Sequence, residues 1–293
     1  MDSIKIVFST EDSAGTLVGA QLREKYGFCK EKTYQVEANG EKKELPAWRH
    51  ESGLAEIIQI SERLSRECEY VGTLPQVFAS KLIIFASRHV SQSGEPCFTA
   101  HATGNFTAKT EFGGRPFELG LTSARASASV LRWLKSEEPN FAGYGVYREA
   151  THHGPTSLPW PSFFAELGST QVQWMDQKAA AHLAGAIMHC VQNFGKENEF
   201  TQGTPAVGFG GTHYCSKFSS LEFEGRNCFS HVASKHVLDG IEKEPVAQAL
   251  EKTVEKTTAG EVEVLLDWKG TNLAQREKLK QIFGQLGIEW KRA

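Results

Sequence analysis

Short apolar runs of strand length alternate along this chain with windows of helical periodicity. The strand candidates lie at 4–8, 54–60, 81–87, 97–102, 144–148, 205–209 and 261–266. The helical windows lie at 122–135, 176–193, 246–257 and 273–286, and Gly287 follows the last one where a C-cap glycine is expected. This alternation favours an α/β fold over an all-β sandwich. We expect a single three-layer domain over residues 1–293 with a mixed, mostly parallel sheet.

Two segments interrupt the alternation and are predicted to be surface excursions. Residues 30–50 are polar and contain Asn39-Gly40, a pair typical of a hairpin turn. Residues 105–121 contain Gly113-Gly114 and Pro116, which favour a mobile loop. No Pro/Ser-rich linker divides the chain, which is why one domain is expected.

Composition excludes several classes of protein. Hydrophobic residues make up 40% and charged residues 23% of the 293 residues, near the average of globular proteins. The net charge of -3 means that a nucleic-acid partner would have to be held by a local basic patch. The apolar run at 82–86 is far shorter than the roughly 18 residues of a membrane span, and no secretory leader precedes residue 4, so we expect a cytoplasmic protein without a membrane segment. The six scattered cysteines contain no Cys-x-x-Cys pair and are expected to be free thiols.

Histidines follow three of the predicted strands. Residues 81–87 lead into Arg88-His89, residues 144–148 lead into Glu149 and then His152-His153, and residues 205–209 lead into Gly210-Gly211-Thr212-His213-Tyr214. If these strands are parallel, their ends meet at one crevice, where ligands bind in open α/β sheets. His101 would join from a fourth strand.

The residue types in these segments suit metal binding or acid–base chemistry. The adjacent imidazoles of His152 and His153, held before a Gly-Pro bend, can serve as metal ligands or as a general base. Glu149 and Glu166 can ligate a metal or orient an imidazole. A metal site would have to be assembled from distant strand ends, and the candidate imidazoles are His89, His101, His152, His153, His213 and His231. His182 and His189, on the predicted helix 176–193, are expected to be structural.

Five ordered blocks together resemble a known family. They are Ser87-Arg88-His89, His101-Ala102-Thr103-Gly104-Asn105, Thr151-His152-His153-Gly154-Pro155-Thr156, Glu166-Leu167-Gly168-Ser169 and Gly210-Gly211-Thr212-His213-Tyr214. In this order they resemble the archaeal and plant type of D-aminoacyl-tRNA deacylase. The segment from His231 to His236 is similar to the family's later His-x-x-Pro-Lys motif, with Ser234 in place of proline.

The resemblance implies a hydrolase that cleaves the ester between a D-amino acid and the terminal ribose of tRNA. It also implies zinc dependence and a fold similar to peptidyl-tRNA hydrolase and phosphorylase-like proteins. The expected partner is the 3′-terminal adenosine of aminoacyl-tRNA, and the protein is expected to be a monomer.

The residue roles are a hypothesis based on these segments. The catalytic set is His89, His101, Glu149, His152, His153, Glu166 and His213. His153 and His213, with His89 or His101, are expected to hold zinc or to act directly on the water, and the predicted zinc ligands are His89, His153 and His213. Glu149 or Glu166 is expected to orient an imidazole. The Gly210-Gly211-Thr212 backbone is expected to donate to an oxyanion. The predicted substrate-binding residues are Thr103, Gly104, Asn105, Thr156, Gly210, Gly211, Thr212, Tyr214 and Lys235.

Several alternatives remain open at this stage. The substrate 2′-hydroxyl could activate the water while the protein supplies shape. A metal-dependent amidase or peptidase would use the same histidines, whereas a phosphorylase-like enzyme or a silent RNA-binding module fits them less well. Two groups of basic residues offer local positive charge for tRNA. One is near the C-terminus (Lys269, Arg276, Lys278, Lys280, Lys291 and Arg292), and the other surrounds the third motif (Lys217, Arg226 and Lys235). The basic residues of the last helix are expected to form a solvated face instead of a tRNA contact.

Overall fold

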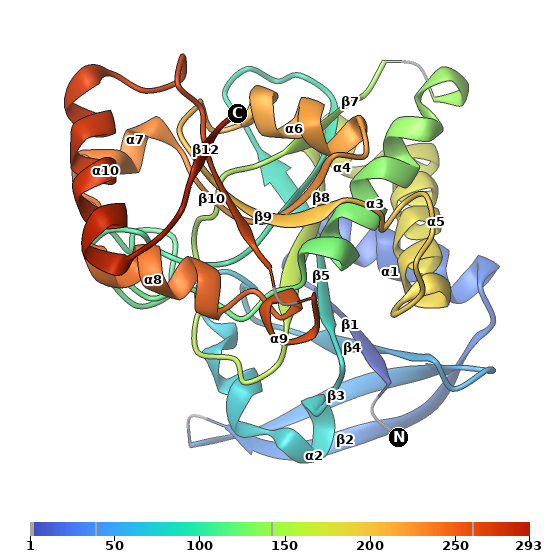
Figure 1. Cartoon of the computed structure of the whole chain (residues 1–293). Helices are drawn as coiled ribbons and strands as arrows, with labels where there is room; N and C mark the ends of the chain where they lie inside the picture. Colours follow the sequence, from blue (N-terminus) through green and yellow to red (C-terminus); the bar gives the residue numbers. More distant parts are fainter. Residues whose placement is uncertain (1–2, 39, 142, 260) are drawn as a thin grey trace.

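Two β-sheets form the centre of the protein (Figure 1). The computed structural model describes residues 3–38, 40–141, 143–259 and 261–293. The larger sheet has the strand order β2-β3-β4-β1-β5-β8-β6-β7 and the smaller one β10-β9-β11-β12. The large sheet comprises β1 (Ile4–Ser9), β2 (Phe28–Ala38), β3 (Glu41–His50), β4 (Ala55–Ile60), β5 (Ile83–Val90), β6 (Cys97–His101), β7 (Gly145–Arg148) and β8 (Ser162–Ser169). The small sheet comprises β9 (Thr204–Phe209), β10 (Asn227–Ala233), β11 (Glu263–Leu266) and β12 (Lys291–Arg292).

Strand directions confirm the mixed α/β fold. In the large sheet β4, β1, β5 and β8 are mutually parallel, whereas β6 runs antiparallel to β8 and parallel to β7. All pairs in the small sheet are parallel. The separate small sheet was not predicted. The prediction of one domain over the whole chain stays a prediction.

Three helices cover one face of the large sheet, on the right in Figure 1. They are α1 (Ser13–Lys25), α3 (Ala124–Ser136) and α5 (Gln177–Asn193). Phe8, Ile84 and Ala100 on the strands pack in one apolar cluster with Val130 and Leu183 on the helices. The opposite face carries Val7, Ile58 and Phe85, which pack against the short helices η1 (Cys68–Thr73) and α2 (Pro75–Phe78).

The small sheet has its own cover of helices, seen at the upper left of Figure 1. One face packs in a cluster with α7 (Lys235–Leu238), α8 (Lys243–Glu251) and α10 (Leu273–Leu286). The other face packs with α6 (Ser216–Phe223) through Phe218. The short helices η2 (Glu138–Asn140), α4 (Gln171–Trp174) and α9 (Glu255–Ala259) complete the set in the described residues.

Some predicted elements have different bounds in the structure. The predicted helix 246–257 is two helices, α8 and α9. At the break, Thr253 Oγ1 lies 2.8 Å from Ala249 O and 2.7 Å from Ser230 Oγ, and Thr253 forms a β-bridge with Thr122. The helix 273–286 is confirmed, with Gly287 in the left-handed conformation as its C-cap. Strands β8 and β10 were missed, because buried polar residues interrupt their apolar runs, namely Glu166 in β8 and Ser230 and His231 in β10.

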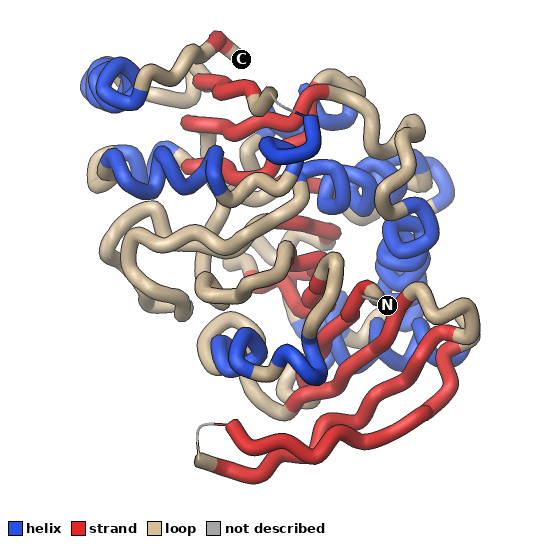
Figure 2. Tube along the Cα trace, turned by 60° about the horizontal axis from the view of Figure 1, so that its bottom comes forward, coloured by secondary structure: helices blue, strands red, loops and turns tan. Residues whose placement is uncertain are grey.

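The two predicted excursions are both tied to the fold. The segment 30–50 lies in the β2–β3 hairpin, which extends the large sheet at its edge (Figure 2); Asn39 of its predicted turn lies outside the described residues. The loop 105–121 is braced by Asn105, whose Nδ2 donates to Gly113 O at 2.9 Å and Arg115 O at 3.1 Å. Gln248 of α8 accepts from Leu119 N at 2.9 Å.

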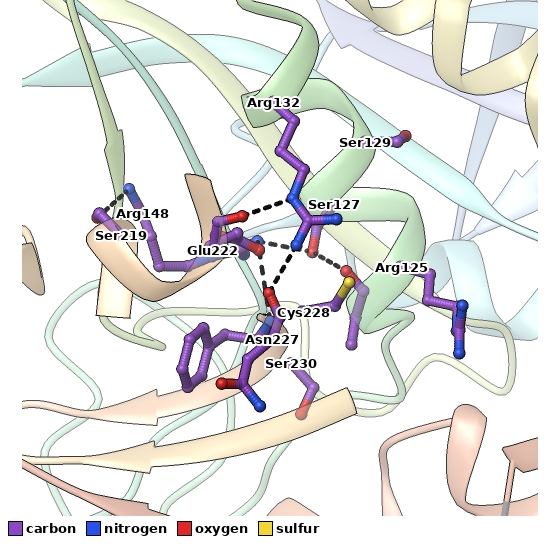
Figure 3. A network of polar contacts seen from close by, with 12 residues as sticks. Arg125, Ser127, Ser129, Arg132, Arg148, Ser219, Glu222, Asn227, Cys228 and Ser230 are labelled. Carbon is purple, nitrogen blue, oxygen red and sulfur yellow. Dashed lines mark hydrogen bonds and ion pairs between the residues drawn. The ribbon is translucent and has the colours of Figure 1, made fainter. Parts of the chain in front are cut away.

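A buried polar network joins the two sheets (Figure 3). Arg148, at the end of β7, makes an ion pair with Glu222 of α6, with Nε–Oε2 at 2.9 Å and Nη2–Oε1 at 2.6 Å, and both side chains are fully buried. Arg132 of α3 donates to the carbonyl oxygens of Glu222 and of Asn227, at the start of β10. The network therefore fixes the chain at Arg148, one residue before Glu149.

Two further predictions can be compared with the structure. All six cysteines are free, and five of them are buried, as expected. None of the helices in the described part of the chain is long and apolar enough to cross a bilayer.

Candidate active site

Side-chain alternation along three adjacent strands collects polar groups on one face of the large sheet. Ile84 and Ala86 of β5 face the helices α1, α3 and α5, so Ser87 and His89 point the other way. The register pairs Glu166 of β8 with Ser87 on one side and with Thr99 of β6 on the other. His101 of β6 lies on the same face, two residues after Thr99. The sheet therefore supplies His89, His101 and Glu166 to one site.

The predicted reason for this convergence is wrong, although the residues do come together. β7 runs antiparallel to β5, and β9 belongs to the small sheet, so their carboxyl ends do not share an edge. The loops after these strands reach the site instead. Ala150 N donates to His213 O and Thr151 N donates to Val232 O, both at 2.8 Å, which holds the loop with His152 and His153 against the loop with His213.

Glu149 lies at the centre of the cluster and is fully buried. Its Oε2 is 2.7 Å from His213 Nε2 and 3.8 Å from His152 Nε2. Its Oε1 is 3.0 Å from His89 Nδ1, which also lies 3.5 Å from Glu166 Oε2. Ser87 Oγ donates to Glu166 Oε1 at 2.6 Å. Two buried carboxylates thus share a set of histidine partners.

Contacts between carboxylates and histidines outweigh the effect of burial on the pKa values in this cluster. Burial would raise the pKa of Glu149, but hydrogen bonds from His213 and His89 outweigh it and hold the pKa well below the ordinary value. Burial alone would lower the pKa of His89, yet the neighbouring carboxylates raise it to about 12. Glu166 has a lowered pKa and His101 a raised one, each because of the other despite burial. Each carboxylate and its histidine partners therefore favour one another's charged forms.

His152 and His153 are held neutral. Burial, followed by the positive charge of His101, lowers the pKa of His152 well below its usual value and that of His153 to about 4. A neutral imidazole keeps a lone pair, which is the form that binds a metal ion.

Backbone carbonyls orient the three imidazoles nearest the sheet in the same way. Nδ1 lies 3.0 Å from Ala102 O in His101, 2.8 Å from Ala150 O in His152 and 2.7 Å from Gly154 O in His153. A hydrogen bond from Nδ1 to a carbonyl leaves Nε2 as the ligand atom, an arrangement common around protein metal sites. The left-handed backbone of His153, with φ of 43°, is part of the turn that aims its ring.

Three groups of side chains could hold a metal ion among the described residues. They are His101/His152/His153, Glu149/His152/His213 and His89/Glu149/Glu166, and the ligand atoms of each lie within 4.8 Å of one another. His101 Nε2 is buried, and Glu166 Oε1 lies 3.7 Å from it, beyond hydrogen-bond distance. The imidazole and carboxylate donors fit zinc, which accepts both.

The predicted zinc ligands His89, His153 and His213 do not share one of these groups. Both ring nitrogens of His89 are occupied, since Nδ1 faces the two carboxylates and Nε2 lies 3.0 Å from Tyr214 Oη. His89 therefore fits a role as a fixed cation between Glu149 and Glu166. His231, another candidate, lies apart, fully buried and with Nδ1 3.3 Å from Thr151 Oγ1.

The predicted oxyanion donors are also corrected. Gly210 N donates to Ala233 O at 2.8 Å and Gly211 N donates to Gly270 O at 3.1 Å, so neither group is free for a substrate. Asn105 and Thr156 brace loops, the latter through hydrogen bonds to Glu69 and Glu118.

A cavity of about 430 Å³ opens over the cluster. Of the predicted catalytic residues, His89, His152, His153, Glu166 and His213 line it, whereas Glu149 and His101 are buried beneath. None of the predicted substrate-binding residues (Thr103, Gly104, Asn105, Thr156, Gly210, Gly211, Thr212, Tyr214 and Lys235) lines it. The other lining residues include Ser9, Asp12, Arg63, Arg66, Arg88 and Phe112, which the sequence analysis did not assign.

His182 and His189 lie away from this cavity on α5. His182 stacks on Phe141 with ring centroids 4.6 Å apart, and His189 packs edge-on against Phe200 at 4.5 Å. Both packings agree with the structural role expected for them.

A family model described as D-aminoacyl-tRNA deacylase matches residues 77–291. The chain belongs to the D-aminoacyl-tRNA deacylase family. Relatives of that name include a protein from Pyrococcus horikoshii, 33% identical over 98% of this chain and 99% of the relative. Another, from Thermococcus onnurineus, is 35% identical over 78% of each chain. The resemblance based on the five blocks is thus confirmed.

The fold of this family member also matches a solved structure. The crystal structure of a conserved protein of unknown function aligns with a TM-score of 0.84 at 24% sequence identity. The alignment covers 99% of this chain and 95% of the other. The match supports the observed arrangement of two sheets within a mixed α/β fold.

Proposed function

We propose that this protein hydrolyses D-aminoacyl-tRNA, releasing the D-amino acid and free tRNA. Membership of the deacylase family supports the reaction class. The observation that carries the proposal is the pair formed by buried Glu149 and His213, 2.7 Å apart, beside three imidazoles that direct Nε2 into the same cluster.

The reaction needs an activated water rather than a strong nucleophile, because an aminoacyl ester is already reactive. The water oxygen bonds to the ester carbonyl carbon, the bond from that carbon to the ribose oxygen breaks, and the ribose oxygen takes a proton. The Glu149 carboxylate accepts a hydrogen bond from His213 Nε2, which leaves Nδ1 of His213 to accept the proton of the water. The His213 side chain is 43% exposed at the cavity, so water can reach it.

We assign zinc binding to His101, His152 and His153. When bound there, zinc would act as a Lewis acid that polarises the ester carbonyl. The donor types and the neutral state of His152 and His153 support this assignment. Zinc binding would release the proton of His101, whose pKa the Glu166 carboxylate raises in the metal-free protein. His89, cationic between Glu149 and Glu166, keeps both carboxylates ionised and in place.

Selective release from tRNA tests the proposed reaction. Purified protein is incubated with D-tyrosyl-tRNA, L-tyrosyl-tRNA and D-tyrosinamide, and release of tyrosine is measured. The proposal predicts release from D-tyrosyl-tRNA alone. Hydrolysis of the amide without hydrolysis of the ester would favour the amidase alternative instead.

Metal content separates the two parts of the proposal. Zinc bound per chain is measured in the wild type and in His153→Gln, with His50→Gln as the matched control outside the cluster. We expect His153→Gln to lose zinc and His50→Gln to retain it. Unchanged zinc content in both variants would refute the assigned ligands without refuting the reaction.

The proposed substrate also bears on location and assembly. A protein that acts on aminoacyl-tRNA would work where translation takes place, which agrees with the predicted cytoplasmic location. The monomeric state stays a prediction.

A further inference from the structure

An exposed aromatic ring lies at the mouth of the cavity over the histidine cluster. Phe112 lines this cavity and is 60% exposed, one of few large apolar side chains exposed to that extent in the described residues. The Arg66 guanidinium lies 5.7 Å from its ring centroid. Most of the ring surface remains open to a ligand.

Close backbone packing holds this ring in place. Gly113, with φ of 98°, approaches the neighbouring segment so closely that a Cβ atom would lie 2.0 Å from Ser65 O. A Cβ on Gly114 would lie 2.7 Å from Asn105 Nδ2 and from Thr156 Cγ2. The loop therefore positions Phe112 beside Arg66. A fixed, exposed phenyl group loses little conformational entropy when it binds a planar partner.

Arginines also line this cavity. Arg63 and Arg66 line it together with the acidic residues Glu11 and Asp12. Arg88 contributes to the lining, but its guanidinium lies 5.3 Å from the centroid of the Trp174 ring, and alternation along β5 puts its side chain on the face opposite to His89. Arg63 Nε lies 3.4 Å from Glu11 Oε2, and both side chains are more than half exposed. Asp12 is turned inward, accepting from Gly15 N and Arg88 N at 2.8 and 2.9 Å. Arg66 thus lies without a carboxylate ion pair among the interactions that the structure describes.

The cavity combines an exposed aromatic ring, a cationic side chain and the histidine cluster beneath them. This combination matches the chemistry of the aminoacylated 3′ end of tRNA. The ester lies on the ribose of a terminal nucleotide, with a purine on one side and phosphates on the other. Bases stack on exposed aromatic rings, and guanidinium groups bind phosphate. The cavity volume of about 430 Å³ falls within the range of about 300–1,000 Å³ typical of ligand sites.

We propose that Phe112 stacks on the 3′-terminal adenine of tRNA while Arg66 binds a phosphate next to it. This inference rests on the proposed function, which it extends from the reacting ester to the nucleotide that carries it. Base and phosphate contacts would place the ester carbonyl over His213.

A binding cycle between protein and RNA variants tests the stacking contact without catalysis. Affinities of wild type and Phe112→Ala are measured for uncharged tRNA and for the same tRNA lacking its terminal adenosine. Wild type should bind intact tRNA about 5- to 150-fold more tightly than truncated tRNA, the range for stacking of one base. Phe112→Ala should bind the two RNAs almost equally, and Phe112→Trp should restore the preference.

A remote variant controls for general loss of apolar surface. Leu273→Ala removes a side chain that is 67% exposed on α10 and should keep the wild-type preference. The inference is overturned if wild type does not distinguish the two RNAs, or if Phe112→Ala distinguishes them as wild type does. These binding measurements do not depend on catalysis. If Phe112→Ala does not change the preference for intact tRNA and the protein still hydrolyses D-aminoacyl-tRNA selectively, only the stacking contact is refuted. If Phe112→Ala loses the preference but the protein shows no deacylation, only the proposed reaction is refuted.

Salt dependence tests the phosphate contacts. Each phosphate contact to single-stranded RNA adds roughly 0.7 to the slope of log affinity against log salt concentration. Arg66→Ala should reduce this slope by about that amount. Lys135→Ala, which removes a side chain that is 41% exposed on α3 and outside the cavity lining, should leave the slope unchanged. An unchanged slope in Arg66→Ala would overturn the phosphate part of the proposal.

Discussion

The ion pair between Arg148 and Glu222 makes a large and specific contribution to stability. Arg148 Nε and Nη2 lie 2.9 and 2.6 Å from the two Glu222 oxygens, and neither side chain is exposed to solvent. Arg148 Nη2 also donates to Ser127 Oγ at 3.1 Å, whereas Nη1 is buried without a partner. Glu222→Gln would leave a buried guanidinium without its counter-charge.

Breaking a buried pair from one side costs about 3–5 kcal/mol. For a chain of this size, about 2 °C of melting temperature is lost per kcal/mol, so Glu222→Gln should melt about 6–10 °C below wild type. Glu224→Gln is the matched control, because Glu224 pairs with Arg226 at the surface with both side chains about half exposed or more. That pair should contribute only about 0–1 kcal/mol.

Thermal unfolding and urea titration of the two variants measure this difference. A double variant, Arg148→Met with Glu222→Leu, removes both charges and should be less destabilised than Glu222→Gln. The reasoning is refuted if Glu222→Gln and Glu224→Gln differ in unfolding free energy by less than about 1 kcal/mol.

Three further predictions concern the loop, a buried histidine and the active-site tyrosine. Gly113→Ala should lower the unfolding free energy by about 1–3 kcal/mol more than Gly143→Ala, since both glycines have φ of 98° but only Gly113 would clash; equal losses in urea titration would contradict this. Burial lowers the pKa of His231 to about 3 in the folded protein. Between pH 3 and 6.5 the unfolded chain therefore binds one proton more than the folded protein does at this residue. The contribution of His231 to the unfolding free energy is present above pH 6.5 and is lost as the pH falls. Between pH 7 and pH 5, the unfolding free energy of His231→Gln should therefore fall by about 2 kcal/mol less than that of wild type. An identical fall in both proteins, measured by urea titration at the two pH values, would disprove the lowered pKa of His231. Tyr214→Phe removes the hydrogen bond to His89 Nε2 and should lower kcat for D-tyrosyl-tRNA by about 5- to 10-fold with KM unchanged; a change in KM alone would point to substrate contact instead.

The sequence predicted the members of the histidine cluster better than the geometry that assembles it. His89, His101 and Glu166 are on strands whose two-residue periodicity fixes the face on which they lie. The strand directions could not be read in the same way, because β6 and β7 carry no local signal that they run against β5. The grouping of the candidate ligand atoms could not be predicted for a related reason, since occupation of both nitrogens of His89 depends on Glu149, Glu166 and Tyr214 from three other segments.

The mouth of the cavity was not predicted at all. Arg66 and Phe112 come from two irregular segments that meet only because Gly113 packs on Ser65. A partial signal existed at Asp12, since a polar cluster follows the carboxyl end of β1, where ligands of parallel sheets bind. The small sheet was missed because Ser230 and His231 interrupt the apolar run of β10, and because its pairing with β9 spans an intervening helix.

The rate of D-tyrosyl-tRNA hydrolysis by His213→Gln tests the central claim most directly. His213 is partly exposed, so its replacement should leave the fold intact, which is checked by thermal unfolding. If the Glu149–His213 pair activates water, single-turnover hydrolysis should fall by about 100-fold or more, while His50→Gln retains the wild-type rate. A loss of less than about tenfold, under about 1.4 kcal/mol, would contradict the account and transfer activation of the water to the substrate's own hydroxyl.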